Sequence, residues 1–119
     1  MSNITYVDRG DAEAYDFVKN DLTRDGAWHD MDLSAVVGAR KRLTILRLAL
    51  QNVTVQSSVE FRTKGYTGAF NQSKTYTYVS NVPCEQSVTI LTDTSGIIQY
   101  RATNNVWGQI NILVKGWFE

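Results

Sequence analysis

Hydrophobic and polar side chains alternate along most of the chain after residue 26. In the segment 58–64, Val59 and Phe61 fall on one side of an extended backbone, whereas Glu60 and Arg62 fall on the other. A period of two indicates β-strands that bury one face. Strands are predicted in this way over residues 27–33, 42–51, 58–64, 75–82, 87–92, 97–103 and 109–118.

Turn-forming residues separate these strands. The segments 34–40 and 65–73 contain glycine and are predicted to be loops, and Pro83 ends the strand before it. Short strands at regular spacing indicate an antiparallel sandwich or barrel rather than βαβ units. We predict one all-β domain over residues 1–119, with an antiparallel two-sheet β-sandwich of about eight strands over 27–119.

The sandwich is expected to bury one row of side chains from each of its main strands. The predicted core residues follow the period-two rule and have polar neighbours on either side. They are Val59, Phe61, Val88, Ile90, Ile98, Tyr100, Ile110, Ile112 and Val114. A register shifted by one residue would instead bury the polar neighbours.

Residues 1–26 are predicted to form an arm or an irregular segment. Within 10–25 two interpretations stay open. Tyr15, Val18 and Leu22 have the spacing of a helical stripe, while the same stretch also alternates as an extended chain does. We favour the extended arm, because everything after it is predicted to be β.

Composition and charge narrow the classes of function. The 119 residues carry 12 basic and 12 acidic side chains, and a formal net charge of zero argues against a dedicated nucleic-acid-binding protein. No apolar run approaches the roughly 20 residues that span a bilayer. The opening MSNITYVDRGD has neither the basic nor the apolar region of a signal peptide.

Metal and redox chemistry have few candidate residues. Cys84 is the only cysteine and His29 the only histidine, which excludes an internal disulfide and a multi-histidine metal site. Both side chains are expected to be structural. We expect no cofactor and no catalytic residue.

The strand 27–33 carries a candidate binding face. Trp28, Asp30 and Asp32 lie on the same side of it, and the two carboxylates are roughly 6.5–7 Å apart along the strand. That spacing overlaps the separation in inverting glycosidases and suits a weak calcium site. The interpretation we favour is a solvated outer face.

Three further aromatic residues are candidates for exposed ligand-binding positions. Tyr66 and Phe70 lie in a glycine-containing loop, and Trp107 stands beside a glycine in a predicted turn. Flat aromatic rings at such positions can stack on sugars, although most aromatic side chains belong to cores or interfaces.

Four segments resemble a known group of proteins. They are AWHDMDLSAVVGARKRLTILRLAL (27–50), SVEFRTKG (58–65), DTSGIIQYRATN (93–104) and INILVKGWF (110–118). Together these resemble small jelly-roll-like β-sandwich proteins of phage and metagenomic origin, often tail, fibre or other virion-associated domains. The resemblance implies a jelly-roll-like architecture and association with a virion. It carries no catalytic motif.

The expected function is a non-enzymatic structural or surface-binding module, associated with a virion as a tail, fibre or capsid accessory protein. Its expected partners are other copies of itself, other virion proteins or host-surface glycans, without nucleic acid or membrane insertion. The alternative is a glycan-binding or glycan-active domain that uses the Trp28 face.

A homo-oligomer is expected because the strand 42–51 is apolar on both faces. Leu43 and Ile45 lie opposite the core side, and Trp28 and Trp117 are also expected to point away from the core. The resemblance favours a trimer. The alternative is that the N-terminal arm covers this face within one chain.

Overall fold

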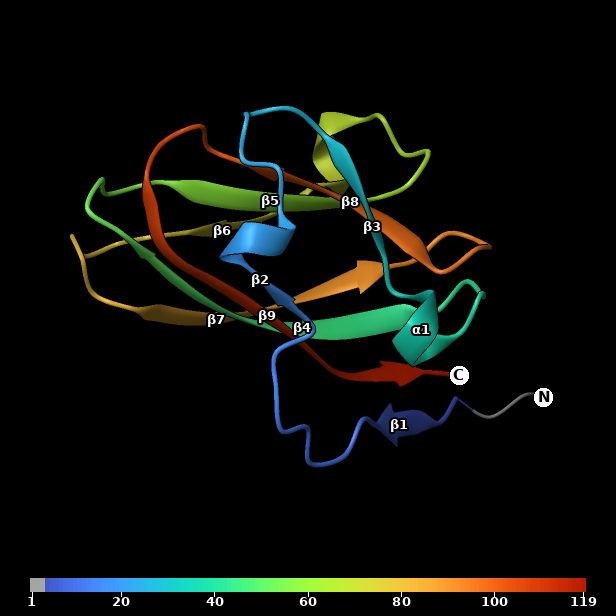
Figure 1. The fold of residues 1–119 in the computed structure, drawn as a ribbon. Helices are drawn as coiled ribbons and strands as arrows, with labels where there is room; N and C mark the ends of the chain where they lie inside the picture. The colour runs from blue at the N-terminus through green and yellow to red at the C-terminus, as the bar shows by residue number, and fades with distance from the viewer. Residues whose placement is uncertain (1–3) are drawn as a thin grey trace.

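The structure, a computed structural model, describes residues 4–119. It consists of two antiparallel β-sheets packed face to face (Figure 1). The strands are β1 (Tyr6–Asp8), β2 (Phe17–Val18), β3 (His29–Asp32), β4 (Leu43–Asn52), β5 (Ser58–Thr63), β6 (Ser73–Tyr76), β7 (Cys84–Leu91), β8 (Ile97–Ala102) and β9 (Trp107–Phe118). The short helical segments are η1 (Lys19–Asp21), α1 (Ser34–Val37) and η2 (Ala69–Asn71).

The strand pairing is that of a jelly roll. One sheet has the order β1-β9-β4-β7, with β2 also paired to β9, and the other has the order β3-β8-β5-β6. The first strands therefore pair with the last, β3 with β8, β4 with β7, and β5 with β6. This nested order is one long antiparallel hairpin wrapped around a common core. The predicted all-β, jelly-roll-like sandwich is confirmed.

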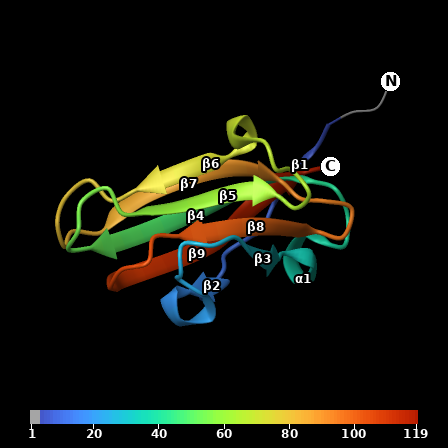
Figure 2. The ribbon, with the colours of Figure 1, turned by 90° about the horizontal axis from the view of Figure 1, so that it is seen from above.

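The core lies between the two sheets, which are stacked one above the other in Figure 1 and overlap when seen from above in Figure 2. Eight of the nine predicted core residues are buried, and Val88 is half-buried because β7 is the edge strand of its sheet. On β4 the alternation is equally clear, with one face fully buried. That face consists of Thr44, Leu46, Leu48 and Leu50.

Several boundaries differ from the sequence-based prediction. The segment 34–40, predicted to be a loop, begins with the single helical turn α1. The strand predicted over 75–82 occupies only 73–76. At its end, the side chain of Gln86 hydrogen-bonds both the backbone N–H and the carbonyl oxygen of Tyr76. Gln86 Oε1 accepts from Tyr76 N at 3.1 Å, and Gln86 Nε2 donates to Tyr76 O at 2.5 Å. The chain then crosses to the five-stranded sheet, where it continues as β7.

The N-terminal arm is mostly extended, as favoured. No helix joins Tyr15, Val18 and Leu22, although the 3-10 turn η1 lies within 10–25. Phe17 pairs with Ile112 on the edge of β9 that lies opposite β4, and Leu22 packs in the core. Thr5 and Glu119 exchange two backbone hydrogen bonds of 3.0 and 2.9 Å, which extend the pairing of β1 with the end of β9 (Figure 1).

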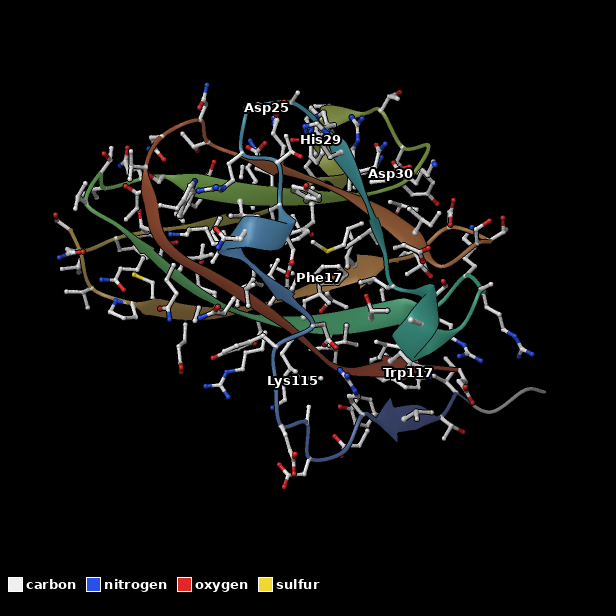
Figure 3. All side chains as sticks on the ribbon, viewed as in Figure 1. Phe17, Asp25, His29, Asp30, Lys115 and Trp117 are labelled. Atoms are coloured by element: carbon white, nitrogen blue, oxygen red, sulfur yellow. The ribbon has the colours of Figure 1, made fainter. Side chains whose placement is uncertain are left out.

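A β-bulge near the end of β9 reverses the direction of its last side chains. Val114 and Gly116 pair with consecutive residues of β4, so Lys115 between them is an extra residue. Trp117, labelled in Figure 3, consequently pairs with the buried Thr44 and packs against the core. The prediction that Trp117 points away from the core was wrong, because a strict period of two does not allow for the extra residue of a bulge.

The outer face of β4 is partly covered by the chain itself. The arm segment 12–15 lies over Arg47 and Leu113, and together they line a hollow of about 250 Å³. Leu43 is 40% exposed and Ile45 is half-buried. The arm therefore covers part of the face that suggested a homo-oligomer.

We expect Ile112→Ala to lower the free energy of unfolding by about 2–5 kcal/mol, because Ile112 is fully buried and its truncation leaves a cavity. Val106→Ala is the matched control, since Val106 is 82% exposed and its truncation should change stability by less than about 0.5 kcal/mol. Denaturant unfolding of the two variants measures the difference. Equal costs would place Ile112 outside the core.

Candidate functional site

The predicted binding face around Trp28 lies on the outside of the four-stranded sheet. The guanidinium carbons of Arg62 and Arg101 lie 4.2 and 4.6 Å from the centroid of the Trp28 ring. Glu60, buried beneath them, pairs with Arg101 and lies 3.4 Å from Lys74 Nζ. Two cations thus already engage the indole through cation–π contacts.

The two carboxylates on β3 both point outward, as expected, but they have different partners. Asp30 accepts hydrogen bonds from Lys64 Nζ at 2.6 Å and from Gln99 Nε2 at 2.9 Å. Asp32 accepts the backbone N–H of Ser34 at 2.8 Å, at the start of α1. Asp30 therefore belongs to the sheet surface, whereas Asp32 positions a helical turn.

Both carboxyl groups are held in their ionised form. The hydrogen bonds from Lys64 and Gln99 hold the pKa of Asp30 below its ordinary value. The hydrogen bonds from Ser34 do the same to the pKa of Asp32. The general acid of a glycosidase needs a raised pKa, and neither group has one. Among residues 4–119, no group of three or more histidine, cysteine, aspartate or glutamate side chains is placed to hold a metal ion.

The three aromatic candidates have different surroundings. Tyr66 is 39% exposed and Phe70 is fully exposed, as predicted. Trp107 is 1% exposed, and its indole Nε1 donates to the carbonyl oxygen of Thr103 at 2.9 Å. The prediction that Trp107 is exposed was wrong, because the turn ends at Val106 and Trp107 already begins β9.

His29 and Cys84 lie in different sheets, on β3 and β7. His29 is half-buried, with Nε2 2.8 Å from Asp25 Oδ1 and its ring 5.8 Å from that of Tyr100 (Figure 3). The contact with His29 lowers the pKa of Asp25. Cys84 is the first residue of β7, and its Sγ lies 3.6 Å from the carbonyl oxygen of Val82.

The structure brings together a surface that the sequence analysis did not single out. We call it the loop end: the β4–β5 loop (53–57), the β6–β7 loop (77–83) and the β8–β9 loop (103–106). These loops lie at the same end of the sandwich, at the left of Figures 1 and 2. The exposed large apolar side chains on the loop end are Val53, Val55, Tyr78, Val79, Val82 and Val106.

Hydrogen bonds join the three loops to one another. The bonds between the first two loops are Gln56 N to Thr77 O (2.7 Å), Thr77 N to Ser57 O (2.9 Å) and Ser80 Oγ to Val53 O (2.7 Å). Asn81 N also donates to Asn52 O, at the end of β4 (2.9 Å). Asn105 attaches the third loop, since its side chain accepts from Asn52 Nδ2 at 2.8 Å and donates to Ser57 Oγ at 2.9 Å. The apolar side chains are therefore presented by a connected framework.

The loop end has a signal in the sequence, which is the absence of charge. No aspartate, glutamate, lysine or arginine occurs in 51–59, 75–84 or 102–111, although 20% of the whole chain is charged. The jelly-roll topology brings these three windows to one end of the molecule. Charge-free windows far apart in sequence point to a common surface only once the topology is known.

Comparison of the chain with protein-family models and with curated proteins found no match. The functional assignment therefore depends on the surfaces described above. Among residues 4–119, none of the helices has the length and apolar character needed to cross a bilayer.

A partly buried ion pair holds the N-terminal arm against β9. Both Nη atoms of Arg9 donate to the carboxylate of Asp16 at 2.7 Å, and Asp16 also accepts the backbone N–H of Val114 at 2.8 Å. Burial alone would raise the pKa of Asp16, but the hydrogen bonds from Arg9 and Val114 outweigh it and hold this pKa below its ordinary value. The arm is thereby closed into a loop over residues 9–16.

We expect Asp16→Asn to lower the free energy of unfolding by roughly 1–3 kcal/mol near pH 7, because it leaves Arg9 without its partner. The folded-state pKa of Asp16 is depressed, so its contribution is complete above the unfolded value of about 3.9 and is lost as the pH falls through the lower folded value. Denaturant unfolding measured from neutral pH into acid should show wild type and variant converging.

Asp11→Asn is the control for this experiment, because Asp11 is exposed in the same loop. It should change stability by less than about 0.5 kcal/mol near neutral pH. A difference between wild type and Asp16→Asn that stays constant into strong acid would contradict the assignment of the ion pair.

Proposed function

We propose that this protein is a non-enzymatic structural or surface-binding module of a virion, such as a tail, fibre or capsid accessory protein, and that it works as a homo-oligomer. The observation that carries the proposal is the loop end, where hydrogen-bonded loops present six exposed large apolar side chains. Exposed apolar side chains gathered at one end of a small domain are typical of a site of association.

Two further points support the proposal. Jelly rolls are the architecture of many viral capsid and lectin domains, so the fold is suited to a structural or surface-binding role, although fold alone does not define a function. The four segments that resemble virion-associated proteins cover most of the sandwich. That resemblance favours three copies in the oligomer.

Light scattering on the purified protein tests the oligomer. We expect a mass of about 40 kDa at micromolar concentration, three times the 13.4 kDa of one chain. A mass of about 27 kDa would replace the trimer with a dimer. A mass of one chain at all concentrations would contradict the homo-oligomer and with it the structural role.

A second candidate function is glycan binding on the outer face of the four-stranded sheet. A polar hollow of about 240 Å³ lies there, and it shares Arg101 with the Trp28 stack. Its lining residues are Gly26, Ser58, Glu60, Arg101, Thr103 and Asn104. Hydrogen-bonding side chains around a small hollow, with an indole close by, are typical of sugar sites.

Glycan binding at this hollow predicts that Trp28→Ala and Asp30→Ala each weaken retention on a glycan array, because they remove the ring and the carboxylate next to the arginine stack. Tyr15→Ala is the matched control, since Tyr15 is an exposed aromatic residue of the arm, which lies over the other sheet. Retention that survives both substitutions would remove this second candidate.

A further inference from the structure

We propose that the loop end is the surface at which copies of this chain meet one another about a common symmetry axis. The inference rests on the proposed homo-oligomer and assigns it a contact surface. It differs from the outer face of β4, which the arm segment 12–15 partly covers.

The loop end exposes six large apolar side chains, each by 46% or more of its surface. Val106 is 82% exposed, Tyr78 63% and Val53 61%. These side chains come from three loops that the topology brings to one end and that hydrogen bonds join to one another, so they gather at one end of the sandwich. Removing such an area from water is the main favourable term in protein association.

The absence of charge indicates what covers this area. In a symmetric oligomer each residue comes close to its own counterpart near the axis, so a charged residue there would face a like charge. The three loops contain no charged residue. Charged residues next to the loops engage other groups. Lys19 donates to the carbonyl oxygen of Trp107, and Glu85 pairs with Arg47. Arg101, which lines a hollow together with Thr103 and Asn104, pairs with Glu60.

The polar groups of the loop end are also suited to meeting copies of themselves. Gln56, Asn81 and Asn104 are exposed, and each side-chain amide carries both a donor and an acceptor. Amides can therefore pair with the same type of group on a second copy. A lone carboxylate or ammonium group cannot do so.

The hydrogen bonds that join the three loops lower the cost of association. Loops held in place before binding lose little conformational entropy when they become an interface. Ser80 and Asn105, for example, tie their loops to the neighbouring backbone and side chains. The surface is thus formed in the single chain and needs no rearrangement to bind.

A second copy fits these features better than a lipid surface does. Surfaces that bind membranes combine apolar side chains with lysine and arginine, which attract anionic headgroups. The three loops have no such side chain, and their exposed apolar residues are valine and tyrosine, without tryptophan or phenylalanine.

The experiment places one charge on the loop end and measures the mass of the protein. Val79→Asp and Val79→Lys each put like charges close together in the oligomer, so we expect dissociation constants at least about tenfold higher than for wild type. Val79 is 55% exposed, so neither variant should lose its fold. An equal mixture of the two variants should associate more strongly than either variant alone, because unlike charges then meet.

Phe70→Asp is the matched control. Phe70 is fully exposed in η2, which lies toward the other end of the sandwich in Figure 1. We expect this variant to keep the wild-type mass in light scattering. Far-ultraviolet circular dichroism and thermal unfolding should show that all three variants are folded like wild type.

The outcomes separate the two proposals. A wild-type oligomer that both Val79 variants leave intact would overturn the loop-end contact and leave the homo-oligomer standing. A wild-type protein that stays monomeric at all concentrations would overturn the homo-oligomer itself. Sedimentation with phosphatidylcholine and with phosphatidylserine vesicles covers the membrane case: binding lost in Val79→Asp, with no change of mass, would overturn the contact in favour of a lipid surface.

Discussion

The whole architecture depends on β9 being paired along both of its edges. One edge holds β4 over ten residue pairs, and the other holds β1 and β2 from the start of the chain. Because residue 6 pairs with residue 118, the five-stranded sheet is complete only when both ends of the chain are in place. Contacts so distant in sequence make folding slow, since a large loop must close before they form.

The parts of the structure that follow a simple period were predictable. Alternation along 58–64 and 97–103 correctly identified strands and their buried faces, because a pleated strand between two sheets has no other way to hide apolar side chains. Trp117 was predicted wrongly because the bulge at Lys115 is set by pairing with β4. Trp107 was predicted wrongly because a neighbouring glycine suggested a longer turn than the three-dimensional packing allows.

The candidate site was harder to predict than the fold. Trp28, Asp30 and Asp32 share a strand face, as the spacing requires, but residues distant in sequence set the surroundings of the first two. Two arginines stack on Trp28, and the hydrogen bond from Lys64 lowers the pKa of Asp30. The loop end is the opposite case. Its valines look like ordinary strand residues in the sequence, and only the nested strand order shows that three charge-free windows meet at one end.

The two hydrogen bonds between Thr5 and Glu119 have a mechanical consequence. In the antiparallel pair of β1 and β9, a force that separates these two residues loads the ladder bonds one after another, so the pair unzips instead of shearing. Unzipping would reach Arg9 next, where the ion pair with Asp16 carries the load. A force that pulls residues 5 and 119 apart would thus open β1 first, while the jelly roll behind Arg9 stays closed.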